Sequence, residues 1–182
     1  MHLKTAAITQ TLLLTAAVVV GSTGAAGAQS APPLRGIPQS ILLQHEDDIA
    51  ALGQIARRPG PLGVAAQKAL DLLKRHHQRE IEYILPPLTL LSALSSGKVT
   101  PDMRWAIEMA DKVKDNREII FQEHTEITDA MNALLIEAQI VNDKEAVDFA
   151  HAVVADSLGD LELQEPMTIL IGEYLRVKLA PK

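Results

Sequence analysis

Apolar residues recur every three or four positions from residue 39 onward, a spacing that places them on one face of an α-helix. Proline, glycine and serine interrupt the pattern and leave four helical segments, at about Gln39–Arg57, Leu62–Pro86, Thr100–Ile140 and Asn142–Leu179. Pro166 lies inside the last segment and is expected to kink it. The chain shows no convincing strand alternation. The pattern predicts an all-α fold, with an up-down-up-down four-helix bundle over residues 39–179.

The first 28 residues follow a different pattern. MHLKTAAITQ carries one lysine, TLLLTAAVVV is an apolar run, and GAAGAQS contains a small-x-small cleavage motif. These features predict a signal peptide (1–28) that is cleaved after Ala28, which leaves an exported protein, periplasmic or secreted, with no membrane segment in its mature form. An uncleaved anchor is the alternative, although the apolar run is short for a membrane span. Residues 29–38 are expected to form a flexible N-terminal segment.

Composition narrows the possible partners. The chain has 182 residues, enough for one domain with a sizeable core, and 47% of them are hydrophobic. Its 17 basic and 23 acidic residues give a net charge of −6, which argues against nucleic acid and anionic membranes as partners. The chain contains no cysteine and therefore forms no disulfide. An exported domain of this kind must be stabilised by its core, by a metal, or by both.

Helical projection places polar side chains among the apolar ones in all four segments. In the last segment, Asp156 and Asp160 fall within about 20° of the centre of the apolar stripe. That stripe consists of Phe149, Val153, Leu163, Met167, Leu170, Ile171 and Tyr174. By the same projection, Glu162, Glu165 and His151 point toward solvent.

The other three segments carry histidines on their apolar faces. His45 lies with Ile41, Leu52 and Ile55; His76 and Glu80 form an i, i+4 pair among Ala66, Ala69, Leu73 and Ile84; and His124 lies among Ile120, Phe121, Ile127, Met131 and Leu135. A single buried histidine is usually a hydrogen-bonded core residue. Three histidines and three carboxylates facing one interior favour a metal site over a metal-free polar network, because unpaired buried charges are costly. The predicted ligands are His45, His76, Glu80, His124, Asp156 and Asp160. His77 is expected to flank the site, and Asp48 to be a solvated helix acid.

The two halves of the chain match each other. QHEDDIAAL (44–52) resembles EHTEITDAM (123–131), with the histidine in the same place. His76 is followed by Glu80 and Pro86 at offsets of four and ten, and Asp156 is followed by Asp160 and Pro166 at the same offsets. The sequence therefore predicts two related helical hairpins in which Asp156 is equivalent to His76.

Residues 39–178 resemble the hemerythrin-like (HHE cation-binding) family, in its exported bacterial form. The similarity lies in QHEDDIAAL, HHQREIEYILPPLTLL, EHTEITDAMNALL and ELQEPMTILIGEYLR. The resemblance implies a four-helix bundle around a non-haem di-iron centre, with Glu80 as a bridging carboxylate and Asp160 as its counterpart. It also implies a protein that binds or senses dioxygen, or handles peroxide or another small diatomic ligand.

The chain departs from that family at Asp156, where a histidine is usual, and at Asp160, where a glutamate is usual. A site richer in carboxylates favours ferric iron. The second metal position could instead be weak, which would leave one iron, manganese or zinc ion. A di-iron oxidase or peroxidase and a structural bundle with a degenerate site are the alternatives to a binding protein.

Overall fold

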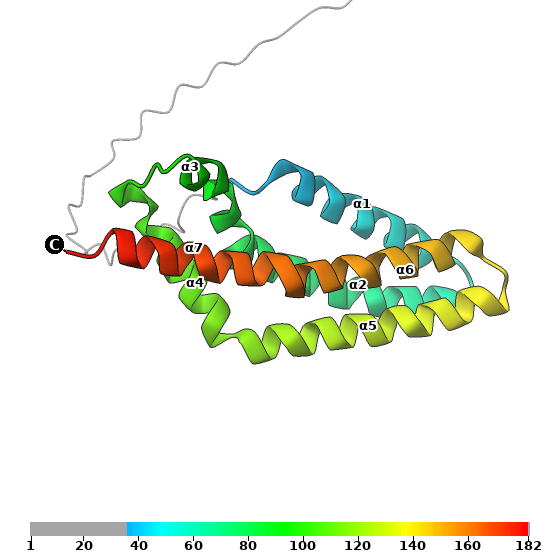
Figure 1. Cartoon of the computed structure of the whole chain (residues 1–182). Coiled ribbons are helices and arrows are strands. Elements are labelled where there is room, and N and C mark those ends of the chain that lie inside the picture. Colours follow the sequence, from blue (N-terminus) through cyan, green and yellow to red (C-terminus); the bar gives the residue numbers. More distant parts are fainter. Residues whose placement is uncertain (1–35, 182) are drawn as a thin grey trace, which may run out of the picture. The chain divides into compact units, whose positions relative to one another are not determined.

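The computed structural model describes residues 36–181, and every regular element in that range is a helix (Figure 1). The expected all-α fold is therefore confirmed for the described part of the chain. The expected signal peptide at residues 1–28, and most of the expected flexible segment at 29–38, lie outside the described residues.

The first half of the described chain contains α1 (Gln39–Ile55), α2 (Pro61–Arg79), the π-helix η1 (Glu80–Ile84), the 3₁₀-helix η2 (Pro86–Leu90) and the short α3 (Leu91–Ser95). Gly60, with φ of 81°, makes the turn between α1 and α2. A positive φ of this kind costs glycine little, because it has no Cβ. Pro61 is the first residue of α2. A backbone N–H at that position would have no acceptor within the helix, so proline loses no hydrogen bond there.

The second half contains the 3₁₀-helix η3 (Pro101–Arg104), α4 (Trp105–Asp115), α5 (Arg117–Ile140), α6 (Lys144–Gly159), the π-helix η4 (Asp160–Gln164) and α7 (Glu165–Lys178). Asp143 caps α6, because its carboxylate accepts a hydrogen bond of 3.1 Å from the Ala146 N–H. The expected helix at 100–140 is thus divided at Asn116, and the expected last helix is divided by a π-turn that precedes Pro166.

Successive helices pack against one another: α1 against α2, α2 against α5, and α5 against α6, while α4 packs against α7 (Figure 1). One hydrophobic cluster joins α1, α2, α5 and α6, and includes Leu52, Leu73, Ile127, Leu134 and Val153. A second cluster lies between η2, η3, α4 and α7, and includes Leu85, Met103, Ile107, Ile171 and Leu175. The polar site described below lies along these same helices.

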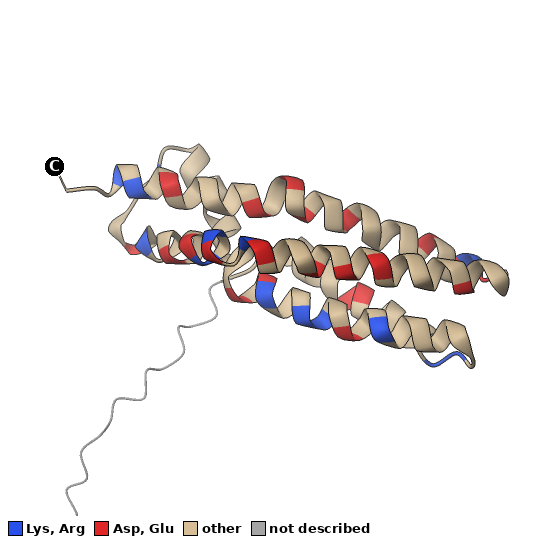
Figure 2. Ribbon diagram, turned by 90° about the horizontal axis from the view of Figure 1, so that it is seen from below, with Lys and Arg blue, Asp and Glu red and all other residues tan. Residues whose placement is uncertain are grey.

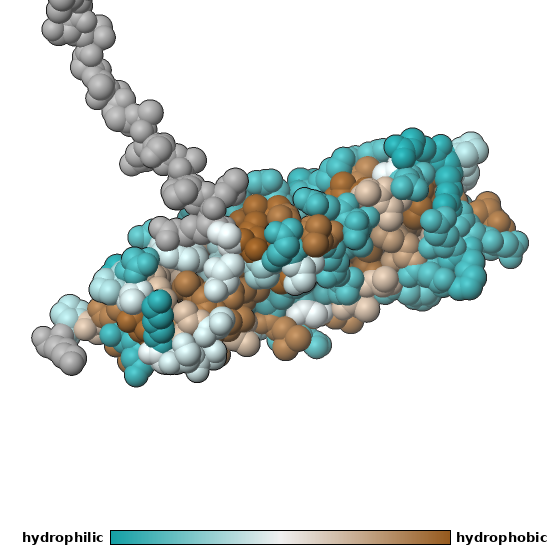
Figure 3. All heavy atoms as spheres, turned by 90° about the horizontal axis from the view of Figure 1, so that it is seen from above, coloured by the Kyte–Doolittle hydropathy of each residue, from teal (hydrophilic) through white to brown (hydrophobic). Residues whose placement is uncertain are grey.

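Several residues expected in the core lie on the surface. Phe121 is 61% exposed and Leu163 is 66% exposed, and Leu170 and Tyr174 are exposed as well. Hydrophobic areas lie between hydrophilic ones on the face seen from above (Figure 3). Acidic and basic residues are interspersed along the described helices (Figure 2). Among the described helices, none has the length and apolar character needed to cross a membrane.

Candidate metal centre

Glu80 lies at the centre of a buried polar cluster. It is the first residue of η1 and is only 1% exposed. Its Oε2 is 3.4 Å from Nε2 of His45 on α1, and its Oε1 is 3.4 Å from Nε2 of His76 on α2. Neither oxygen has a hydrogen-bond partner with acceptable geometry. The carboxylate therefore presents one oxygen to each of two imidazoles, with no donor that satisfies it directly.

The backbone changes geometry where Glu80 enters the cluster. The Leu85 N–H donates to the Glu80 carbonyl at 2.8 Å, an i to i+5 bond that defines a π-turn. The other half of the chain does the same, because the Glu165 N–H donates to the Asp160 carbonyl. π-Turns are rare in proteins as a whole, and a large share of those that occur lie at functional sites. The positions that the sequence repeat makes equivalent, 80 and 160, thus both begin a π-helix.

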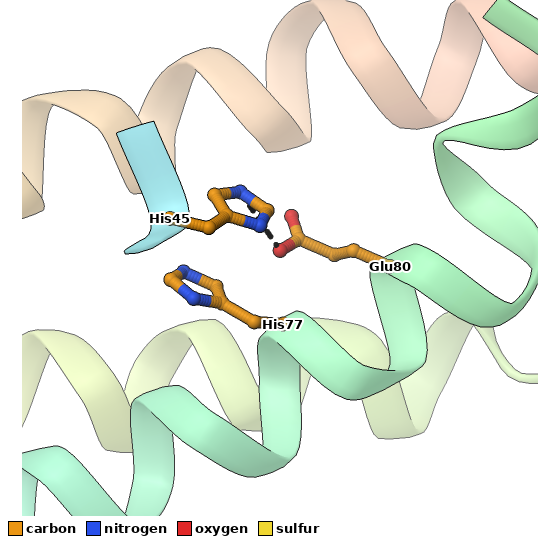
Figure 4. A group of neighbouring side chains, drawn as sticks. All are labelled: His45, His77 and Glu80. Carbon is orange, nitrogen blue, oxygen red and sulfur yellow. Dashed lines mark ion pairs between the residues drawn. The ribbon is translucent and has the colours of Figure 1, made fainter. Parts of the chain in front are cut away.

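His77 belongs to the cluster, whereas the sequence predicted a flanking role. Its ring is buried and stacks on His45, with ring centroids 3.7 Å apart and planes 7° from parallel. Figure 4 shows both rings beside the Glu80 carboxylate. The ligand atoms of His45, His77 and Glu80 lie within 4.8 Å of one another. A signal for this was present in the sequence, because His77 follows Leu70 by seven residues and Leu73 by four, the spacing of one helix face.

A second group consists of His76, Glu80 and Asp160, whose ligand atoms also lie within 4.8 Å of one another. Asp160 is partly buried and accepts a hydrogen bond from the Gln164 side chain. Glu80 is a member of both groups. The structure therefore brings together four of the six predicted ligands, His45, His76, Glu80 and Asp160, and adds His77.

His124 is buried but does not join either group. Its Nδ1 is 2.7 Å from Ser157 Oγ and its Nε2 is 3.0 Å from Glu165 Oε1, so both ring nitrogens have partners. Its ring makes an edge contact with His76, at a centroid distance of 4.2 Å. The sequence placed Glu165 in solvent, and that prediction was wrong, because Glu165 is buried against His124. Ser157, His124 and Glu165 form a hydrogen-bonded chain, and Ser157 lines a cavity of about 30 Å³.

Asp156 is exposed, and its predicted inward position was also wrong. Its Oδ2 accepts a hydrogen bond of 2.7 Å from the Gln44 side chain, at the rim of the same small cavity. The neighbouring Ser157 takes the buried position instead. Asp48 is half-buried at this rim, and its pKa is raised to about 6 by burial and by the charges of Asp156 and Asp47. It is less solvated than the sequence suggested.

The titration of the cluster reflects its burial and its density of charge. Burial, and next the charge of Glu80, raise the pKa of Asp160 to about 8. Burial acts to lower the pKa of His76, but its contacts with Glu123 and Glu80 outweigh that effect and raise the pKa to about 10. Burial and the proximity of His45 lower the pKa of His77 to about 3. Burial opposes ionisation of Glu80, yet the adjacent histidines, His76 first, hold its pKa below the ordinary value.

The donor set fits a metal ion. Several of its atoms are buried and have no hydrogen-bond partner, namely His45 Nδ1, His76 Nε2, His77 Nδ1 and both oxygens of Glu80. Buried polar atoms normally have partners, so such a concentration requires an explanation. Imidazole nitrogens and carboxylate oxygens are ligands for iron, manganese and zinc. These buried groups could therefore hold a metal ion, and they do not by themselves specify which one.

Comparison with known proteins provides no identification. No family model matches the chain, and no curated protein and no solved structure matches it either.

Proposed function

We propose that this protein is an exported, hemerythrin-like metal-binding protein whose helices hold a non-haem di-iron centre that binds or senses dioxygen or a related small oxidant. The observation that carries the proposal is the place of Glu80, buried and without hydrogen-bond partners, between two three-ligand groups that share it. A carboxylate with one oxygen directed to each group is suited to bridge two metal ions. Helical bundles build carboxylate- and histidine-ligated di-iron sites from inward-facing side chains of this kind.

The fold proposed with this function is the up-down-up-down four-helix bundle. The four successive helices of that bundle would be α1, α2, α4 with α5, and α6 with α7. The packing of α1 on α2, α2 on α5 and α5 on α6 supports this arrangement, because each bundle helix then lies beside the next one in the sequence. Short connections such as residues 56–60 are typical of antiparallel neighbours in such bundles.

Each side chain has a defined task in this proposal. His45 and His77 would hold one ion and His76 and Asp160 the other, with Glu80 between them. Iron in these positions would supply redox chemistry toward dioxygen or peroxide. Asp160, whose pKa is about 8, would lose its proton on binding a metal. The cavity lined by His45, His76, His77 and Asp160 measures about 30 Å³, a size that favours small ions and molecules over an organic substrate.

Metal analysis tests the proposal directly. Purified protein is reconstituted with ferrous iron without oxygen, exposed to air, desalted, and assayed for metal content and near-ultraviolet absorption. Two iron ions per chain with the absorption of a bridged ferric pair are expected. Less than about one bound metal per chain would contradict the proposal. Catalytic consumption of peroxide would instead indicate the oxidase or peroxidase alternative.

Export is a separate part of the proposal and rests on the sequence of residues 1–28. We expect the chain produced in a bacterial host to be recovered outside the cytoplasm with Gln29 as its first residue. Fractionation followed by N-terminal sequencing of the recovered protein measures both. A chain that retains Met1 in the cytoplasmic fraction would refute it.

A further inference from the structure

The two halves of the chain make equivalent contacts across the polar cluster. Gln44 and Glu123 each precede the histidine of a matching segment, QHEDDIAAL and EHTEITDAM. The Gln44 amide donates to Asp156 Oδ2 at 2.7 Å, and Glu123 Oε2 lies 3.4 Å from His76 Nδ1. Asp156 and His76 are themselves equivalent in the sequence repeat. The residue before each histidine therefore reaches across to the same position of the other half.

The chemistry of each pair is complementary. An ionised carboxylate only accepts hydrogen bonds, and an imidazole N–H donates one, which suits Glu123 and His76. A side-chain amide donates to a carboxylate, which suits Gln44 and Asp156. The half that contacts a hydrogen-bond donor, His76, supplies an acceptor, and the half that contacts an acceptor, Asp156, supplies a donor. This correspondence indicates that the contact holds the residue at position 76 or 156, and is not an incidental surface pair.

Glu123 is itself held in place. Arg79 donates to its two carboxylate oxygens, from Nε at 2.9 Å and from Nη2 at 2.8 Å. The Arg79 Nη1 atom also donates to the Tyr83 hydroxyl at 3.2 Å. A two-point contact between arginine and a carboxylate fixes the plane of the carboxylate as well as its position. Glu123 is thus a rigid acceptor for the ring of His76, which is nearly fully buried.

We propose that Glu123, fixed by Arg79, is a positioning residue that orients His76 so that Nδ1 is occupied and Nε2 faces Glu80 and Asp160. In metal sites, a carboxylate on the outer nitrogen of a histidine sets the ring orientation, and its loss typically lowers metal affinity by about 10- to 100-fold. The metal-affinity consequence rests on the function proposed above. The orientation of the ring does not, so the two are tested separately.

The first experiment compares crystal structures of the metal-free protein and its variants. In Glu123→Ala we expect the His76 ring to leave the orientation in which Nε2 faces Glu80. In Glu123→Gln the remaining oxygen still accepts from Nδ1, so the ring is expected to stay. Glu126→Ala is the matched control, because Glu126 lies one turn further along α5 and makes only surface contacts with Arg75 and Gln122. An unchanged His76 ring in Glu123→Ala would overturn the proposal.

The second experiment measures affinity for Co²⁺ by calorimetry in the same four proteins. We expect a loss of about 10- to 100-fold in Glu123→Ala, a smaller loss in Glu123→Gln, and no change in Glu126→Ala. If the parent binds Co²⁺ and Glu123→Ala binds it equally well, positioning by Glu123 is refuted while the proposed function stands. If the parent binds no metal, the proposed function fails, and the ring orientation in the crystal still decides the role of Glu123.

Discussion

Replacement of Glu80 by glutamine is the sharpest test of the shared carboxylate. The change keeps the shape of the side chain and removes its charge at the point where both three-ligand groups meet. A carboxamide has one carbonyl oxygen and is a poor bridge between two cations, so both metal positions should be weakened together. Loss of any other member, such as His77 or Asp160, would weaken only one of the groups.

The size of the effect follows from linkage between binding and folding. A metal present at 100 times its dissociation constant stabilises the folded state by about 2.7 kcal/mol, because it binds the folded chain only. For a chain of this size about 1 kcal/mol changes Tm by roughly 2–4 °C, so the parent should gain roughly 5–11 °C. In Glu80→Gln we expect most of that gain to disappear.

The assay is thermal unfolding by circular dichroism with chelator and with Zn²⁺, a metal with no redox chemistry. The shift in Tm is taken within each variant, so a change in metal-free stability cancels. Glu82→Gln is the control, because Glu82 belongs to the same π-helix, is exposed, and makes a 3.0 Å hydrogen bond only with Gln78. An undiminished shift in Glu80→Gln, or an equal loss in both variants, would refute the assignment of Glu80 as the shared ligand.

Two further predictions concern the metal-free fold. The contribution of His77 to the free energy of unfolding should fall as pH falls from 6.5 to about 3, because the unfolded chain protonates His77 near its ordinary pKa while the folded chain resists until about pH 3. Urea denaturation measures the free energy of unfolding at each pH, and its pH dependence should be flatter in His77→Gln than in the parent. His151→Gln is the control and should match the parent, because His151 is exposed. Equal slopes in the two variants would contradict the burial effect. Gly172→Ala should destabilise the fold by about 1–3 kcal/mol, because the added methyl would overlap Ala110 where α7 crosses α4. Gly159→Ala, with open space around it, should be neutral or stabilising by up to about 1 kcal/mol, and a loss as large as that of Gly172→Ala would refute the packing explanation.

The sequence predicted the helices of the first half and the inward-facing polar side chains on them well, for a physical reason. Most of the apolar residues that defined the stripes of the first two helical segments, among them Leu52, Ile55 and Leu73, are buried in one cluster. Ile84 is buried in another cluster, and Ile41 is partly buried. A helix face defined by core residues points toward the interior. His45, His76 and Glu80 lie on such faces, so their inward orientation could be predicted. His77 was missed because a helix buried this deeply can direct two adjacent side chains inward.

Helical projection was less reliable for the last helical segment than for the first two. Leu163, Leu170 and Tyr174 recur at helical spacing but lie on the outer face, so they drew the predicted stripe toward Asp156 and away from Ser157. The π-turn at Asp160 adds a local change of twist that a uniform rotation per residue does not describe. Burial of Glu165 depends on His124 from another helix, which is a tertiary contact with no signature in the local sequence.

The difference between the two halves explains where a metal can bind. In the repeat, Asp156 stands where the first half has His76, and Ser157 stands where it has His77. His124, the equivalent of His45, is hydrogen-bonded to Ser157 through one ring nitrogen and to Glu165 through the other, whereas His45 stacks on His77. The hydrogen-bonding capacity of His124 is therefore satisfied without a metal. The unsatisfied atoms belong almost wholly to the first half, which supplies every member of the two ligand groups except Asp160. Metal affinity should consequently depend on His45, His76, His77 and Glu80, with the second half contributing one carboxylate and the Glu123 contact that orients His76.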